Sequence, residues 1–127
     1  MELVITFTKR QEGEYIAALS GSLDSQTYTE LEEKLKAVLV PSTKILIINM
    51  SELSYISSMG ISTILHAKKF IEQQGGAFIM INLQPQIKLA FDIIKALGDM
   101  QVFQSIAEAD AYLSAMERKE VEKHKNP

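Results

Sequence analysis

Five serines lie close together in the middle of the chain, at Ser51, Ser54, Ser57, Ser58 and Ser62. Two of them, Ser57 and Ser58, come where a helical pattern begins. A serine at that point is a good N-cap, because its hydroxyl accepts a hydrogen bond from a free backbone N–H. The same position suits a phosphorylation acceptor, since the helix dipole and free N–H groups tolerate a phosphate. A phosphate adds a charge of about −1.5 to −2, enough to disrupt a docked interface. The two roles do not exclude each other.

Two neighbours of these serines bear on the same question. Gly60 lies in the first turn of the expected helix, where glycine costs up to ~1 kcal/mol relative to alanine. That cost indicates a close approach, either by a neighbouring backbone in helix–strand packing or by a partner. His66 follows Ser58 by about 12 Å of helical rise, too far for a nucleophile–base hydrogen bond. The sequence therefore predicts no catalytic residue here and reads His66 as an exposed helix residue.

Composition excludes several classes of chemistry. The chain has 127 residues, no cysteine and two histidines, so we expect no thiolate site and no metal site. It has no glycine-rich phosphate loop and no nucleophile elbow. The net charge of −3 argues against a protein whose main function is to bind nucleic acid. The apolar runs are too short to span a membrane, and the N-terminus lacks the pattern of a signal peptide. We expect a cytoplasmic protein that is not an enzyme and needs no cofactor.

The surrounding elements follow from periodicity. Apolar residues alternate over residues 3–8 and 15–19, which predicts an N-terminal hairpin that ends at Gly21. Ile45–Ile48 and Ala77–Ile81 are typical of strands buried on both faces, and a short strand is expected around residues 100–103. The polar residues Ser51–Ser54 are expected to form a connection.

Four helices are expected between and after these strands. The first is capped at Asp24 or Ser25 and stops at Pro41; the second runs from Ser57 or Ser58 to Gly75. Pro85 opens the third, with Ile94 and Leu97 among its core residues and Gly98 at its end. A capping box, Ser105 to Glu108, begins the fourth, with Met116 among its inward residues. We therefore expect a single α/β domain, residues 1–115: a mixed sheet of four to five strands with an N-terminal hairpin and about four helices.

The last residues form a separate feature. Seven of the ten residues 116–125 are charged. We expect residues 116–127 to be a charged helix end or tail in solvent, with a partner-binding role as the alternative.

Three segments in order resemble one known family. They are Leu19–Asp24 (LSGSLD), Ile45–Gly60 (ILIINMSELSYISSMG) and Gly75–Pro85 (GGAFIMINLQP), and residues 102–111 also fit. Together they resemble the STAS domains of bacterial anti-sigma factor antagonists over about residues 3–113. The resemblance implies a protein that binds an anti-sigma factor, often a serine kinase, and so releases a sigma factor. Phosphorylation of a serine at the start of the second helix then ends binding, and a phosphatase resets the protein.

Carried over by position, the acceptor is Ser58, with Asp24 as the family's acid in the turn before the first helix. The resemblance implies a partner-binding surface of Asp24, Ser57, Ser58, Met59, Gly60 and Ser62. Two residues depart from the family pattern. Ser57 replaces the usual aspartate, which makes Ser57 an alternative acceptor. Met59 replaces a small residue, and it is either an adaptable partner contact or a core residue.

These departures keep other functions open. One is a STAS protein that docks without phosphorylation, as a scaffold or a transporter-associated subunit. Another is a module with weak nucleotide binding, as is attributed to some relatives.

Overall fold

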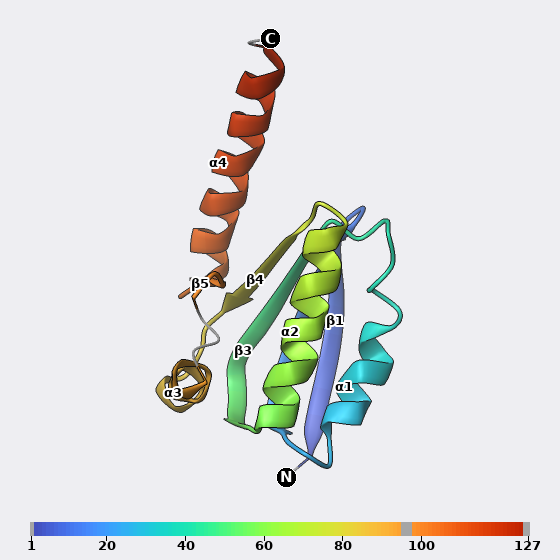
Figure 1. Ribbon diagram of the computed structural model, residues 1–127, viewed down its shortest axis with the longest axis vertical. Coiled ribbons are helices and arrows are strands. Elements are labelled where there is room, and N and C mark those ends of the chain that lie inside the picture. The colour runs from blue at the N-terminus through green and yellow to red at the C-terminus, as the bar shows by residue number, and fades with distance from the viewer. Residues whose placement is uncertain (1, 95–97, 126–127) are drawn as a thin grey trace.

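The computed structural model describes residues 2–94 and 98–125, with side-chain exposure up to residue 119. Five strands and four helices alternate along this part of the chain (Figure 1). They are β1 (Leu3–Gln11), β2 (Glu14–Leu23), α1 (Tyr28–Leu35), β3 (Ile45–Ile56), α2 (Ser58–Gln73), β4 (Ala77–Ile81), α3 (Pro85–Ile93), β5 (Gln101–Phe103) and α4 (Ile106–Lys125).

The strands form one mixed sheet in sequence order, β1-β2-β3-β4-β5. The β1–β2 hairpin is antiparallel, and each later strand pairs in parallel with the one before it. The helix-linked strands from β2 onward supply this parallel part, as β-α-β units do. The predicted fold class is therefore confirmed.

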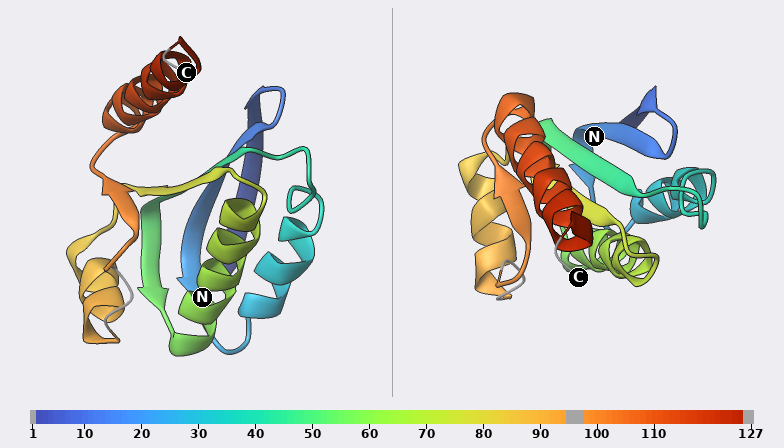
Figure 2. Two further views of the ribbon diagram at one scale, coloured as in Figure 1. Left: turned by 45° about the horizontal axis from the view of Figure 1, so that its top comes forward. Right: turned by 90° about the horizontal axis from the view of Figure 1, so that it is seen from above.

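Two hydrophobic clusters lie on opposite faces of the sheet. The larger one packs α1, α2 and α3 against it, and the smaller one packs α4 against β3, β4 and β5. Figure 2 shows α1 and α2 side by side on their face. Phe78 and Ile79, adjacent in β4, are buried in different clusters. Because successive side chains of a strand point to opposite faces, a strand covered on both sides has a continuous apolar sequence.

Both β2 and β3 extend further than the sequence indicated. β2 continues past Gly21, and β3 continues through the predicted connection at Ser51–Ser54 to Ile56. Two irregularities in register interrupt the pairing, but Ser20 still pairs with Glu52 and Leu23 with Ile56. The polar residues there are exposed, while Leu53 and Ile56 are buried. Backbone pairing therefore makes a strand of a segment whose composition is typical of a loop.

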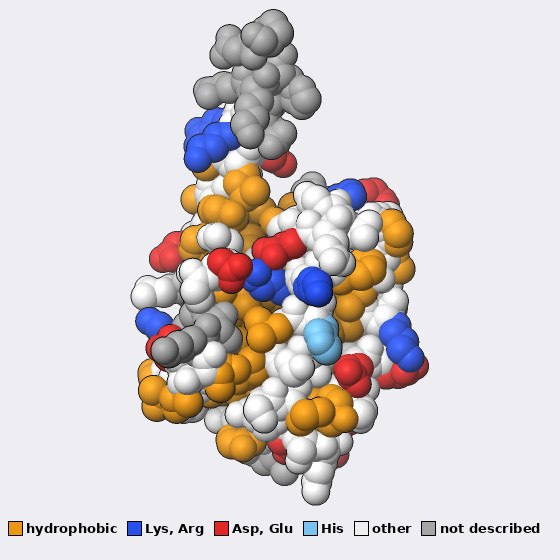
Figure 3. Space-filling view, viewed as in Figure 1, with side chains coloured by type: hydrophobic (Ala, Val, Ile, Leu, Met, Phe, Trp, Pro, Cys, Tyr) orange, Lys and Arg blue, Asp and Glu red, His pale blue; other side chains and the backbone are white. Residues whose placement is uncertain are grey.

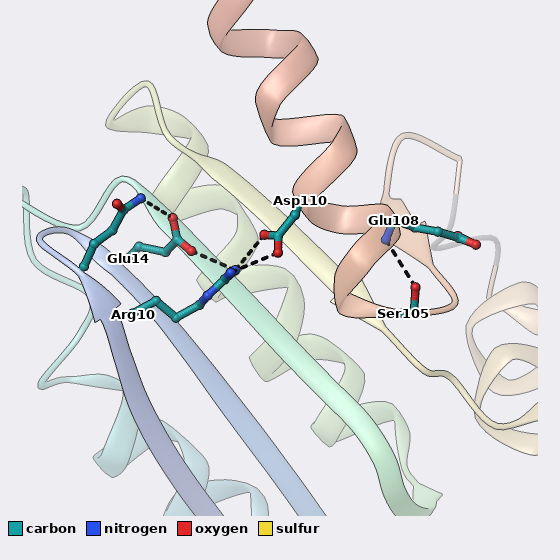
Figure 4. Close-up of polar contacts among 6 residues, drawn as sticks. Arg10, Glu14, Ser105, Glu108 and Asp110 are labelled. Carbon is teal, nitrogen blue, oxygen red and sulfur yellow. Dashed lines mark hydrogen bonds and ion pairs between the residues drawn. The ribbon is translucent and has the colours of Figure 1, made fainter.

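The helices also differ from expectation at their ends. α1 begins at Tyr28, because a turn at Asp24 precedes it, and ends at Leu35. Ile94 and Met116, both predicted to be inward, are exposed. Ile94 follows the last residue of α3, so the helical spacing on which its prediction rests does not extend to it. Met116 lies on the part of α4 that leaves the sheet. Leu97 lies outside the described residues. The capping box before α4 is confirmed in part: Ser105 Oγ accepts from the Glu108 N–H at 3.2 Å (Figure 4), but Glu108 Oε2 accepts from the N–H of Gln104.

The C-terminal segment continues α4. The helix passes the expected boundary at residue 115 without a break and projects beyond the end of the sheet (Figure 1). Where α4 leaves the sheet, an ion-pair cluster ties it to the hairpin.

Arg10 forms this cluster near the end of β1 (Figure 4). Its guanidinium donates to both carboxylate oxygens of Asp110, at 2.8 and 3.0 Å, and lies 2.9 Å from Glu14 Oε2. The Glu14 carboxylate is buried and also accepts from the Gln11 amide at 2.9 Å. The hydrogen bond with Arg10 lowers the pKa of Asp110. One cation therefore neutralises a buried acid of the hairpin and holds the first turns of α4.

Arg10→Met should lower the free energy of unfolding by about 1–3 kcal/mol, because it leaves the buried Glu14 carboxylate without its cation. This loss of stability is smaller than for a fully buried ion pair, because the Gln11 amide still donates a hydrogen bond to Glu14 and because Asp110 is partly exposed. Urea denaturation at pH 7 measures it. Lys9→Met is the matched control, since Lys9 pairs with the exposed Glu12, and its urea midpoint should barely change.

The contribution of Asp110 to the stability of the fold should depend on pH. Its pKa is lower in the folded state than the ordinary 3.8, so it stabilises the fold above that value. The stabilisation is lost as the pH falls through the lower folded-state pKa. The difference in the free energy of unfolding between wild type and Arg10→Met should therefore become smaller below about pH 4. An equal difference at pH 7 and pH 3 would contradict a role for the Asp110 pair.

Candidate functional site

The candidate site is built where the ends of β2 and β3 meet the start of α2. The backbone N–H of Ser57 donates to the carbonyl oxygen of Leu23 at 2.9 Å. Leu23 is the last residue of β2, and Ile56, its pairing partner, is the last of β3. Both side chains are buried. The sheet therefore fixes the position from which α2 begins.

Ser57 and Ser58 have different environments. Ser57 is the N-cap: its backbone is extended, and its hydroxyl oxygen accepts from the Gly60 N–H at 3.3 Å. It is only partly exposed. Ser58 is the first residue of α2 and is exposed, and no hydrogen bond between described residues uses its hydroxyl. The cap role predicted for this pair therefore belongs to Ser57.

Gly60 is buried against the end of β2. A Cβ atom at this position would lie 2.7 Å from Leu23 Cγ and 2.8 Å from the Leu23 carbonyl oxygen. It would also lie 3.0 Å from Ile56 Cγ1. Only a glycine allows α2 to approach the strand end this closely. The helix–strand packing expected from the sequence is confirmed, and Gly60 acts through the position of α2 and not as an exposed contact.

Asp24 holds the turn that follows β2. One carboxylate oxygen accepts from the backbone N–H groups of Gln26 at 2.9 Å and Thr27 at 3.0 Å. The hydrogen bond from Gln26 is the main cause of the lowered pKa of Asp24. Thr27 is buried and its hydroxyl lies 2.8 Å from the carbonyl oxygen of Ser22. Asp24 therefore orders the loop beside Leu23, and the backbone hydrogen bonds that it accepts favour its ionised form.

Exposed apolar side chains surround the start of α2. Met59 is 43% exposed and Tyr55, near the end of β3, is 53% exposed. Met59 is therefore not a core residue. Ser62 is exposed one turn further along α2. At the same end of the molecule, α3 exposes Leu89 and Ile93, and hydrophobic groups are visible there in Figure 3.

Sequence reasoning did not single out Tyr55 or Leu23. Tyr55 directly follows Ser51–Ser54, the segment that composition assigns to a connection. The role of Leu23 depends on its pairing with Ile56, at the end of a different strand. No local pattern marks either of them.

The described residues offer no sign of catalysis or metal binding at this site. They contain no group of three His, Cys, Asp or Glu side chains that could hold a metal ion. His66 is exposed on α2, as the sequence predicted. The site is instead a surface on which the exposed residues Ser58 and Ser62 lie beside exposed apolar side chains.

Comparison with known proteins identifies the family. The STAS domain model matches residues 7–109. The chain belongs to the STAS domain family. A curated relative, BtrV of Bordetella bronchiseptica, is assigned as an anti-sigma factor antagonist. It is 30% identical over 108 residues, which cover 84% of this chain and 93% of BtrV. The resemblance inferred from the three sequence segments is therefore confirmed.

Solved STAS structures have the same fold. An anti-sigma factor antagonist from Mycobacterium paratuberculosis superimposes with a TM-score of 0.78 at 17% identity, covering 87% of this chain and 93% of that one. The phosphorylated form of the Bacillus cell fate determinant SpoIIAA gives 0.70 at 20% identity, covering 87% and 99%. The murine anion transporter Slc26a9 gives 0.72 at 22% identity, but only 19% of that chain is covered.

The fold therefore occurs both as small proteins and as a part of a transporter. In the portion of this STAS domain protein that the structure describes, no helix is long and apolar enough to cross a membrane.

Proposed function

We propose that this STAS protein is an anti-sigma factor antagonist whose binding to an anti-sigma factor is ended by phosphorylation of Ser58. The observation that carries the proposal is the exposed Ser58 hydroxyl at the start of α2, with exposed Met59 beside it. The relationship to BtrV supports the class of partner. The partner would be a serine kinase that also modifies Ser58, a phosphatase would reset the protein, and the cycle would run in the cytoplasm.

The charge of a phosphate explains how such a switch works. Docking over Met59 and Tyr55 removes water from their surroundings. A group of charge about −1.5 to −2 at Ser58 would have to lose its hydration in that interface. In the free protein the same group lies at a helix N-terminus, where the helix dipole stabilises it. Phosphorylation would therefore favour the free state over the complex.

Ser57 keeps the N-cap role of the aspartate found at this position in relatives but does not carry its negative charge. The resemblance places aspartate at this position in relatives, and serine and aspartate are comparable N-caps. The hydrogen bond from Gly60 to Ser57 preserves that function. Serine at position 57 does, however, remove the negative charge that aspartate places next to the acceptor in relatives. A kinase that modifies Ser58 would therefore have to recognise an uncharged side chain at this position. The engaged, partly buried hydroxyl of Ser57 favours Ser58 over Ser57 as the acceptor.

The other residues of the proposed partner-binding surface would have different roles in binding. Met59 and Ser62 are exposed and would touch the partner directly. Asp24 and Gly60 would act by position, the first through its turn and the second through the approach of α2 to Leu23.

A second candidate function is docking that does not depend on phosphorylation, as a scaffold or a transporter-associated subunit. The observation that favours it is the departure at Ser57 and Met59 from the family's pattern around the acceptor. In that case a charge at position 58 would leave partner binding unchanged.

Affinity capture from the native host distinguishes the two functions. Wild type, Ser58→Glu and Gln73→Glu are used as baits, and bound proteins are identified by mass spectrometry. Gln73→Glu adds the same charge at the exposed far end of α2, outside the proposed partner-binding surface, and is the matched control. We expect wild type and Gln73→Glu to retain a kinase-like anti-sigma factor and Ser58→Glu to lose it. Equal retention by all three would establish docking that is independent of charge at Ser58.

A further inference from the structure

A pocket opens where β4 and β5 end. After β4 the chain enters α3, which packs on the face of the larger hydrophobic cluster. After β5 it enters α4, which packs on the opposite face. Neighbouring parallel strands whose following helices leave to opposite faces create a crevice at their carboxyl ends, the place where α/β sheets bind ligands. The pocket here has a volume of 530 Å³, within the range of small-molecule sites.

The walls of the pocket combine one positive charge with uncharged polar groups. Its floor is apolar, from Leu83, Val102 and Phe103, and its polar lining is Ser51, Asn82, Gln84, Lys88 and Gln104. Among the described residues of this lining, Lys88 is the only charged one. It takes no part in the ion pairs found among the described residues. The acids nearest the lining residues along the chain are Glu52, Asp92, Asp99 and Glu108, and none of them lines the pocket. Glu108 Oε2 accepts from the backbone N–H of Gln104, and Asp99 lies 3.5 Å from the ammonium group of Lys68.

Hydrogen bonds fix the rim between the strands. Asn82 has a φ of 61°, a left-handed conformation that asparagine tolerates better than most residues. Its backbone N–H donates to the Phe103 carbonyl oxygen at 3.0 Å, and its side-chain amide donates to Asn49 Oδ1 at 3.1 Å. The Gln84 amide donates to the Ser51 carbonyl oxygen at 2.7 Å. A rim held in this way does not have to be ordered when a ligand binds.

We propose that this pocket binds a small organic anion, with the Lys88 ammonium as its charge partner. Ser51 and Gln104 line the same space, and the hydroxyl of the first and the side-chain amide of the second would donate hydrogen bonds to the anion. The apolar floor would take the carbon skeleton. The anionic group would be a carboxylate or a phosphate, since both present oxygen acceptors to an ammonium group. This site is separate from Ser58 and does not depend on the proposed phosphorylation switch.

Titration of the full-length protein with malonate, inorganic phosphate and uncharged malonamide tests the site. Backbone amide NMR shifts are followed up to about 50 mM at constant ionic strength, a range that detects millimolar binding. We expect saturable shifts around Asn82, Lys88 and Gln104 with malonate, with phosphate or with both, and none with malonamide. Malonate alone would assign a carboxylate ligand, and phosphate alone a phosphoryl ligand. Absence of saturation with both anions, or the same shifts with malonamide, would overturn the proposal.

Two lysine variants identify the charge partner. Lys88→Gln should weaken binding of the anion about tenfold, the effect of losing one charge-assisted hydrogen bond. Lys69→Gln removes an exposed lysine of α2 that does not line this pocket, and it should bind like wild type. Equal affinities for wild type and Lys88→Gln would overturn the assignment. Ser58→Glu should also bind like wild type, which separates this test from that of the proposed function.

Discussion

Incubation with the proposed kinase partner and ATP is expected to place one phosphate on this protein, at Ser58, and Ser58→Ala is expected to take up none. The reason is geometric. A kinase must bring the acceptor hydroxyl into its own active site, and Ser58 is exposed at the first residue of α2. Ser57 is partly buried, and its oxygen accepts from the Gly60 N–H. Intact-protein and peptide mass spectrometry measure both the amount and the position of the phosphate.

Ser57→Ala is the informative control for this experiment. It removes the N-cap hydrogen bond, at a cost of about 1 kcal/mol in the free energy of unfolding, but leaves the Ser58 hydroxyl in place. We expect it to be phosphorylated, provided that circular dichroism shows a folded protein. Phosphate found on Ser57 in the wild-type protein would contradict the site assignment. Phosphate on neither residue, with the kinase bound, would favour docking that is independent of phosphorylation.

The stability of Ser58→Glu separates a switch from simple unfolding. A negative charge in the first turn of a helix interacts favourably with the helix dipole, by about 0.3–1 kcal/mol at low salt. The described first turn of α2 contains no acid that would oppose it. Ser58→Glu should therefore unfold at the same urea concentration as wild type or slightly higher. Loss of partner binding by such a stable variant is an effect on the interface.

Gly60→Ala is expected to destabilise the fold by about 1–3 kcal/mol, because the new methyl group would overlap the Leu23 carbonyl oxygen and side chain. Alanine gains up to ~1 kcal/mol in helix propensity, which offsets part of that cost. The backbone contact decides the sign, since a carbonyl oxygen of β2 cannot rotate away as a flexible side chain can. Urea denaturation of wild type and variant measures the difference.

Gly98→Ala is the matched control for this substitution. A Cβ atom at Gly98 would have no atom within 4 Å, so overlap cannot lower its stability. We expect Gly98→Ala to unfold at nearly the same urea concentration as wild type. The displaced α2 of Gly60→Ala should also weaken partner binding, because Ser58 and Met59 lie on its first turn. A Gly60→Ala variant as stable as wild type would show that α2 can move away from Leu23 at little cost.

Local sequence patterns determined much of the architecture. The apolar runs at Ile45–Ile48 and Ala77–Ile81 lie in buried strands, as their continuous apolar character predicted. Pro85 opens α3, where its missing N–H costs nothing. The serines before α2 include its cap. Each of these features depends on residues within a few positions of each other, so the local sequence is enough to predict it.

Tertiary structure alone decided the properties that join distant segments. The extension of β3 through Ser51–Ser54 depends on backbone pairing with β2, which no side-chain pattern encodes. The burial of Glu14 beside Arg10 depends on where α4 crosses the sheet. The same holds for the choice between Ser57 and Ser58 and for the pocket beside Lys88. Each arises where elements remote in sequence come within a few ångströms, and their side-chain exposure follows from that approach and not from residue type.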